Sequence, residues 1–199
     1  MKAALDQFTE NLKRARSLTG LAQSLTRLTT DAVDLTDIYR ASLVHGVSAV
    51  DQFVHEFARL GMLEVYRGNR PLTDSHSSFR VPLSATKAGI ADATNDDWLD
   101  QTIRDAHSWL SFQHPDKVAD AVRLMSTVKL WEAVGKELDT SPQDVRTQLT
   151  AIVDRRNKIA HEADMDPTNP GHRWPIDEVL VTDALNFLER IAHAIYKVA

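Results

Sequence analysis

The feature that most constrains the fold is a long segment, residues 36–65, in which apolar side chains recur every three or four positions. The apolar positions are Ile38, Leu43, Val47, Val50, Phe53, Val54, Phe57, Leu60 and Leu63. This spacing places them on one side of an α-helix. Similar stripes occur within residues 3–30, 96–110, 116–138, 143–153 and 177–196. With few strand-like alternations, the pattern predicts an all-α helical bundle.

The predicted helices form one compact unit, because 199 residues of which 43% are hydrophobic suffice for one sizeable core. We expect residues 1–34 to be an N-terminal helical extension and residues 35–199 to be the main helical domain. Residues 62–83 are candidates for a short extended hairpin. Ser141 followed by Pro142 is a typical helix start, and it predicts a helix that continues to about residue 162.

The composition excludes several classes of site. The chain has no cysteine, which excludes structural disulfides and thiolate metal sites. The histidines form no HExxH pattern, so we expect neither a metal nor another cofactor. No apolar run reaches the length that spans a membrane. We therefore expect a soluble, cytoplasmic protein without a membrane partner.

The net charge of −5 argues against a broad surface for nucleic acid, because phosphate contacts require clustered Lys and Arg. Carboxylates gather in residues 92–105, whereas Arg155, Arg156 and Lys158 form a small positive island. An acidic protein can still hold a basic pocket. Any contact with RNA is therefore expected to be local and to involve this island.

The island lies in the segment Arg155–Glu162, which contains Arg156, Asn157 and His161. RNA can be cleaved without a metal, because its own 2′-hydroxyl is the nucleophile. Imidazole titrates near neutral pH and can act as base or acid, while guanidinium stays charged and matches two phosphate oxygens. Arg156 and His161 are thus candidate catalytic residues, and Asn157 is a candidate to orient the phosphate or the imidazole.

The spacing of Arg156 and His161 poses a geometric problem, since residues five apart on a helix diverge by about 140°. They share a face only if the helix ends or bends between them, and the acidic, proline-containing sequence after His161 favours such an ending. Glu162 and Asp164 are candidates to set the orientation or pKa of the imidazole. A structural alternative also exists, because basic residues in a last turn complement the helix dipole.

The bare pattern has low specificity. Fifteen Arg and eight His give roughly one pair at any chosen spacing by chance. Arg40 and His45 have the same spacing inside the long amphipathic segment. We interpret that pair as a solvated arginine and a histidine on a helix face. The context of Arg156 and His161, not the spacing alone, makes them candidates.

That context resembles a known family. The sequences RRNKIAHEADMDP and RWPID, which include the motif, are similar to the RiboL-PSP-HEPN branch of the HEPN-domain ribonucleases. LVHGVSAVDQFVHE and FQHPDKVADA also resemble this family, so the likeness covers most of residues 35–199. It implies a helical, commonly homodimeric protein that joins the motifs of two protomers in one metal-independent endoribonuclease cleft.

The resemblance also implies roles for individual residues and partners. Arg156 and His161 would be catalytic. Asn157 would support them. Arg155 and Lys158 of the positive island, together with Glu162 and Asp164, are further candidate supporting residues because of their charge and position. RNA would be the substrate, and many relatives act as toxins or in antiphage defence, which makes an antitoxin or another defence protein a candidate partner. Trp174, in the predicted loop after the motif, is the tryptophan best placed to stack on a base.

Two alternatives remain. Some HEPN domains only bind RNA or support assembly, so the protein can be a noncatalytic module. Residues 35–83 can instead form a winged helix, with a turn at His45–Val47 and with Arg67, Arg70 and Arg80 near DNA phosphates. The recognition helix of that model would offer Asp51, Glu56 and only Arg59, which is poor chemistry for a DNA groove. An unbroken helix across residues 45–48 would exclude it.

Overall fold

A computed structural model describes residues 1–30, 33–92 and 95–199. Within these ranges the chain forms helices α1 (Lys2–Thr26), α2 (Thr36–Tyr66), α3 (Asp74–Ser77), α4 (Leu83–Ala91), α5 (Asp97–His107), α6 (Pro115–Arg123), α7 (Leu130–Glu137), α8 (Pro142–Glu162) and α9 (Glu178–Val198). The described residues contain one isolated β-bridge, between Met165 and Arg173, and no strand. The all-α prediction is confirmed. The hairpin expected near residues 62–83 is wrong, because α2 continues to Tyr66.

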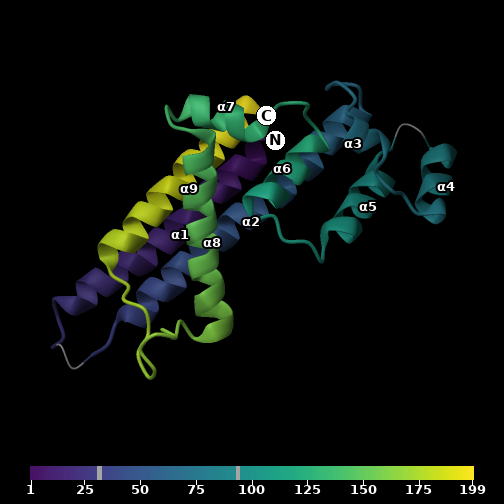
Figure 1. Cartoon of the computed structure of the whole chain (residues 1–199). Helices are drawn as coiled ribbons and strands as arrows, with labels where there is room; N and C mark the ends of the chain where they lie inside the picture. Colours follow the sequence, from purple (N-terminus) through teal and green to yellow (C-terminus); the bar gives the residue numbers. More distant parts are fainter. Residues whose placement is uncertain (31–32, 93–94) are drawn as a thin grey trace.

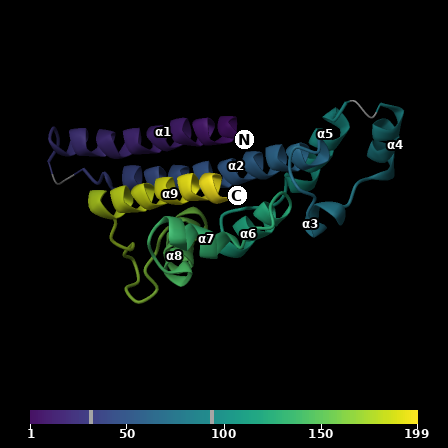
Figure 2. The same ribbon diagram turned by 90° about the horizontal axis from the view of Figure 1, so that it is seen from above.

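The arrangement of the helices is visible from two directions. Helices α1, α2 and α9 run side by side, and α8 crosses them on one side (Figure 1). In the view from above, α6, α7 and α8 lie on the same side of the three long helices, while α3, α4 and α5 extend beyond one end of the bundle (Figure 2). The segment between α8 and α9 lies at the opposite end, beside the start of α2 (Figure 1). The bundle therefore has a peripheral arm, formed by α3, α4 and α5, at one end and the candidate motif near the other.

Helix α2 is the central element of the bundle and has no break within its 31 residues. Its apolar stripe is buried as predicted, with Val47, Val50 and Phe57 almost inaccessible to solvent. Gly46 allows a close approach of α9, because a Cβ atom at this position would lie 2.3 Å from Cδ2 of Leu185. Continuous helix across residues 45–48 makes the winged-helix hypothesis wrong.

Helix α1 packs into the same hydrophobic core as the rest of the bundle. Phe8, Leu12 and Ala15 are buried in the cluster that α2, α8 and α9 also supply. The hydroxyl of Ser42 on α2 donates to the carbonyl of Ala15 at 2.7 Å and lies 2.9 Å from the hydroxyl of Thr19. The predicted N-terminal extension is thus packed against α2, although its residues 31 and 32 lie outside the described ranges.

The segment predicted as one helix over residues 116–138 is two helices, α6 and α7. Helix α6 ends at Arg123 with Leu124 as its C-cap, and shortly afterwards the hydroxyl of Ser126 accepts a hydrogen bond from the backbone N–H of Val128 at 3.3 Å. Ser and Thr side chains that bond to nearby backbone groups compete with helix formation. Pro115 opens α6, and Nδ1 of its N-cap, His114, accepts from the N–H of Asp116.

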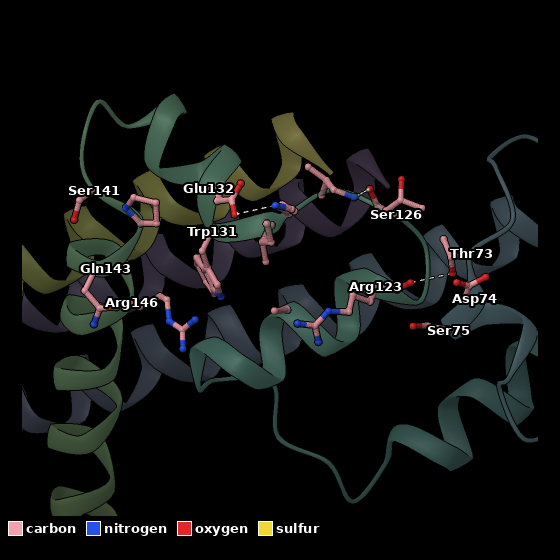
Figure 3. A pocket seen from close by; sticks show the side chains of 16 residues that line it. Thr73, Asp74, Ser75, Arg123, Ser126, Trp131, Glu132, Ser141, Gln143 and Arg146 are labelled. Carbon is pink, nitrogen blue, oxygen red and sulfur yellow. Dashed lines mark hydrogen bonds and ion pairs between the residues drawn. The ribbon is translucent and has the colours of Figure 1, made fainter.

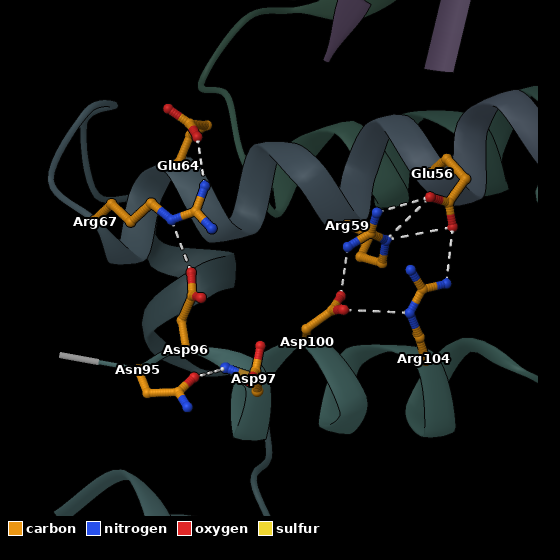
Figure 4. A network of polar contacts seen from close by, with 9 residues as sticks. All are labelled: Glu56, Arg59, Glu64, Arg67, Asn95, Asp96, Asp97, Asp100 and Arg104. Atoms are coloured by element: carbon orange, nitrogen blue, oxygen red, sulfur yellow. Dashed lines mark hydrogen bonds and ion pairs between the residues drawn. The ribbon is translucent and has the colours of Figure 1, made fainter. Parts of the chain in front are cut away.

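Two carboxylates of the acidic cluster seen in the sequence, Asp96 and Asp100, are paired with the protein's own arginines (Figure 4). Arg59 on α2 binds Glu56 at 2.8 Å and Asp100 on α5 at 2.5 Å. Arg67 pairs in the same way with Glu64 and Asp96. These ion pairs connect the peripheral arm to α2, and they occupy two arginines that the winged-helix hypothesis would need for DNA.

None of the helices in the described part of the chain combines the length and the apolar character that crossing a membrane requires.

The titration of His107 gives a test of the packing between α2 and α5. His107 is 5% exposed, and its ring lies among those of His55, Phe79 and Phe112. Burial, followed by the charge of His55, lowers the pKa of His107 from 6.5 to about 4. The folded protein therefore holds a neutral imidazole over a pH range in which the unfolded chain is protonated. Its stability is expected to fall as the pH drops from about 6.5 to about 4.

We expect His107→Phe to remove a pH-dependent loss on the order of 3 kcal/mol between pH 7 and pH 4. The measurement is the free energy of unfolding in urea at pH 7 and pH 4 for the native protein and the variant. His193→Gln, which removes an exposed imidazole, is the control. Equal pH dependence of the native protein and His107→Phe would contradict the assignment.

Candidate functional site

The candidate motif lies on the last two turns of α8. The helix begins as predicted, because Ser141 is the N-cap and its hydroxyl accepts from the N–H of Asp144 at 3.0 Å. Pro142 occupies the first turn, where its missing N–H costs no hydrogen bond. Val145, Leu149, Ile152 and Val153 are buried against the bundle. This packing orients the helix and carries the segment 155–162 to the end of the bundle.

Helix α8 ends only after both candidate catalytic residues. Its C-cap, Ala163, has φ 52°, and Asp164 has φ 59°, so both adopt the left-handed conformation. The backbone N–H groups of both residues donate to the carbonyl of Lys158. Arg156 and His161 therefore lie on continuous helix, and they diverge by about 140° around its axis. The expectation that the helix ends between them is wrong.

A buried ionic cluster holds this helix end. Asp164 is 0% exposed, and its Oδ2 accepts from Nε of Arg40 at 2.7 Å and from Nη2 of Arg155 at 2.9 Å. Both arginines also donate to the carbonyl of Trp174, at 2.9 Å and 3.0 Å. Arg155 donates in addition to the carbonyl of Pro175. The cluster joins α2, α8 and the segment between α8 and α9.

Burial lowers the pKa of Arg155, the attraction of Asp164 opposes this shift, and the nearby charge of Arg40 adds to it. Two guanidinium groups thus share one buried carboxylate, and Nη2 of Arg155 also donates to the carbonyl oxygens of Trp174 and Pro175. Oδ1 of Asp164 is buried without a hydrogen-bond partner. Among the groups of this cluster, the positive charges outnumber the negative ones.

The cluster changes the interpretation of three residues. Arg40 was expected to be solvated, but it is 6% exposed and paired with Asp164. Arg155 and Asp164 were expected to support the catalytic groups, and their hydrogen bonds are instead with each other, with Arg40 and with backbone carbonyls. One sequence signal could have identified Arg40. It stands three residues before Leu43, on the apolar stripe of α2, where an unpaired charge is costly.

The segment between α8 and α9 is a folded loop. Its two sides meet at the bridge between Met165 and Arg173, and the N–H of Asp166 donates to the carbonyl of His172 at 2.9 Å. Hydrogen bonds from Thr168 lower the pKa of Asp166, whose carboxylate stabilises the turn. Arg173 forms an ion pair with Asp37 of α2. The loop ends at Asp177, whose side chain accepts from the N–H of Leu180 and caps α9.

Arg156, the predicted catalytic arginine, differs from its neighbour Arg155. Its Nη1 donates to Oδ1 of Asn157 at 2.9 Å. The Nε atoms of both arginines are buried and find no hydrogen-bond partner among the described residues. Within the described ranges Arg156 forms no ion pair with a carboxylate. Asn157, which was expected to orient the phosphate or the imidazole, contacts the arginine in this structure. The charge of Arg156 is not neutralised by the protein.

The remaining predicted site residues lie near the surface. His161 and Glu162 are exposed on the last turn of α8. Lys158 is half-buried, and its Nζ lies 5.4 Å from the centre of the Trp174 ring. Lys158 and His161 are three residues apart, so they occupy neighbouring positions on the helix surface. The structure thus brings His161, Lys158 and Trp174 to one region and directs Arg156 elsewhere around the helix.

A cavity of about 780 Å³ at the other end of α8 is a second candidate (Figure 3). Residues from α3, α6, α7 and the start of α8 line it, and three of them are cations. Each cation is paired with a carboxylate: Arg123 with Asp120, Lys129 with Glu132 and Arg146 with Asp116. Its lining residue Gln143 is roughly 20 Å from Arg156 along the helix. The cavity is therefore separate from the motif, and its positive charge is compensated.

Comparison with known proteins gives one match. The model of a family described as RiboL-PSP-HEPN matches residues 9–199. This match begins further towards the N terminus than the resemblance seen in the sequence, and it includes most of α1. No curated protein and no solved structure matches the chain.

The buried cluster makes a prediction about stability. Asp164→Ala leaves the buried Arg40 and the half-buried Arg155 without this carboxylate, so we expect the free energy of unfolding to fall by about 3–5 kcal/mol. Asp154→Ala removes an exposed carboxylate from the same helix and is expected to change it by less than about 0.5 kcal/mol. Urea unfolding monitored by circular dichroism measures both. Similar values for the two variants would show that the cluster does not stabilise the fold.

Proposed function

Because this chain belongs to the RiboL-PSP-HEPN family, we propose that it is a metal-independent endoribonuclease whose site includes Arg156 and His161. The family suggests a function related to RNA. The observation that carries the proposal is the contrast between two adjacent arginines. Arg155 is paired with the buried Asp164, whereas Arg156 forms no ion pair with a carboxylate of the described residues and lies on the same helix end as an exposed histidine.

The chemistry assigns a role to each residue. His161 takes the proton from the 2′-hydroxyl or gives one to the departing 5′-oxygen. The guanidinium of Arg156 stabilises the negative charge that develops on the phosphorane. Asn157 holds the guanidinium through its side-chain oxygen. This reaction needs no cofactor, because the nucleophile is part of the RNA.

We further propose that the active form is a homodimer. A single α8 directs Arg156 and His161 about 140° apart, so one phosphate does not contact both side chains of one chain without a change in the helix. A second copy related by a two-fold axis can place its own motif against the first. It also doubles the local positive charge, which offsets the net charge of −5 at the place where RNA binds.

An enzyme of this kind acts on RNA in the cell that produces it. We therefore propose a cytoplasmic toxin or antiphage effector that an antitoxin or another defence protein restrains. The proposal is supported by a site that needs no cofactor and by the family match, which includes most of the chain. Such a restraint is the simplest way in which a cofactor-independent nuclease remains compatible with growth of its host.

The direct test is cleavage of a mixed RNA pool in the presence of EDTA. We expect the native protein to produce 2′,3′-cyclic phosphate ends. We expect His161→Ala to lower the rate about 10²- to 10⁴-fold and Arg156→Ala about 10²- to 10³-fold, as for loss of a general acid–base and of a charge-stabilising donor. His45→Ala is a matched control, because His45 is exposed on α2 five residues after the buried Arg40. It should retain full activity.

Two outcomes would contradict this function. Equal cleavage by the native protein and His161→Ala would place the active site elsewhere. RNA binding without cleavage by the native protein would favour the alternative, a noncatalytic HEPN module.

The dimeric site makes a separate prediction. Arg156→Ala and His161→Ala are each inactive, but a heterodimer of the two retains one native arginine and one native histidine on opposite copies. Random exchange of subunits should restore roughly a quarter of the native activity. Half of the dimers are mixed, and in each mixed dimer one of the two Arg–His pairs is intact. Coexpression with two affinity tags isolates the mixed dimer for assay. No recovery of activity in isolated mixed dimers would show that one chain supplies both groups.

A further inference from the structure

We propose that the indole ring of Trp174 binds an unpaired nucleobase of the RNA, next to the phosphate on which the Arg156–His161 site acts. The inference rests on the proposed function and adds a base-binding site to it. It concerns a residue of the loop between α8 and α9, outside the motif itself. It also specifies the substrate class, which is single-stranded RNA.

The backbone of Trp174 is held by buried groups. Its carbonyl accepts from Nη2 of Arg40 at 2.9 Å and from Nη2 of Arg155 at 3.0 Å. Its N–H donates to the carbonyl of Asp164 at 2.9 Å. Because Asp164 and Arg40 are buried at the centre of the ionic cluster, these three hydrogen bonds fix the position from which the indole projects. A binding group is effective when its backbone is already in place before the ligand arrives.

The side chain of Trp174 forms fewer hydrogen bonds than its backbone. Its Nε1 is buried and has no hydrogen-bond partner among the described residues, and the residue as a whole is half-buried. Trp131 provides a contrast, because it is 7% exposed and its Nε1 donates to the carbonyl of Pro115 at 3.1 Å. Trp98 also has an unpartnered Nε1, but its ring packs edge-on against Tyr66 and over Gly89. The ring of Trp174 instead faces the ammonium group of the half-buried Lys158.

The position of this lysine places the indole beside the motif. Nζ of Lys158 lies 5.4 Å from the centre of the Trp174 ring. Lys158 precedes His161 by three residues, so both side chains leave adjacent positions of α8. The indole therefore lies against the same side of the helix as the exposed imidazole. A nucleotide whose base stacks on Trp174 has its phosphate within the positive region around Lys158.

The contact between Lys158 and Trp174 is one that RNA can replace. A cation–π contact near the surface is weaker than the stacking of a base on an aromatic ring. A base that displaces the ammonium group from the ring also brings a phosphate to which the ammonium can bind. Since every base has a π-face, this site is expected to discriminate unpaired from paired nucleotides more strongly than one base from another.

The experiment uses the full-length His161→Ala protein, which binds RNA without cutting it. Its affinity for a fluorescently labelled single-stranded RNA is measured by anisotropy, alone and with Trp174→Leu or Trp174→Phe added. We expect Trp174→Leu to weaken binding about 5- to 150-fold and Trp174→Phe to retain most of the affinity, because phenylalanine keeps an aromatic face. Trp109→Ala is the matched control, since Trp109 is 79% exposed and lies outside the motif.

RNA-induced quenching of tryptophan fluorescence is the second measurement. We expect it to be smaller in Trp174→Phe than in the parent, which tests the contact without loss of the aromatic ring. Equal affinity of Trp174→Leu and the parent, or equal quenching with and without Trp174, would overturn the proposal. If the native protein cleaves RNA while these results are negative, only the base-binding site fails. If Trp174→Leu loses affinity while the native protein does not cleave, the site stands and the nuclease function fails.

Discussion

The candidate site depends on the interaction of one buried carboxylate with two arginines. Removing Asp164 from water costs several kcal/mol, and only close, hydrogen-bonded cations offset such a cost. Arg40 from α2 and Arg155 from α8 supply them, at 2.7 Å and 2.9 Å. The same arginines hold the carbonyl of Trp174. One set of contacts therefore fixes the end of α8 to α2 and sets the path of the loop.

The cluster also accounts for the backbone at the end of α8. Left-handed conformations are unfavourable for residues other than glycine, yet Ala163 and Asp164 both adopt them. The carboxylate of Asp164 reaches the two arginines only because the chain turns inward at this point. The ionic contacts and the hydrogen bonds to the carbonyl of Lys158 compensate for the unfavourable conformation. The helix end is thus determined by tertiary contacts more than by its local sequence.

Local patterns predicted the elements whose formation depends on neighbouring residues. The apolar stripe of α2 and the Ser141–Pro142 start of α8 are examples. The hairpin was wrong because the apolar residues before Tyr66 continue the stripe of α2. The cluster could not be predicted from local patterns, since Arg40 and Asp164 are 124 residues apart. Whether Arg40 is buried or solvated depends on a carboxylate that becomes its neighbour only in the folded chain.

The two arginines at the start of the motif have different surroundings although they are adjacent in the sequence. Adjacent positions on a helix point about 100° apart, so Arg155 and Arg156 do not face the same surroundings. Arg155 faces the loop and donates hydrogen bonds to two loop carbonyls and to Asp164. Arg156 points away from these groups and donates to Asn157. The rotation continues to His161, about 140° further from Arg156 and roughly 7.5 Å along the axis. A straight helix that separates an anion-binding group from a proton-transfer group in this way favours a site in which each copy of a dimer contributes a different group to the same phosphate.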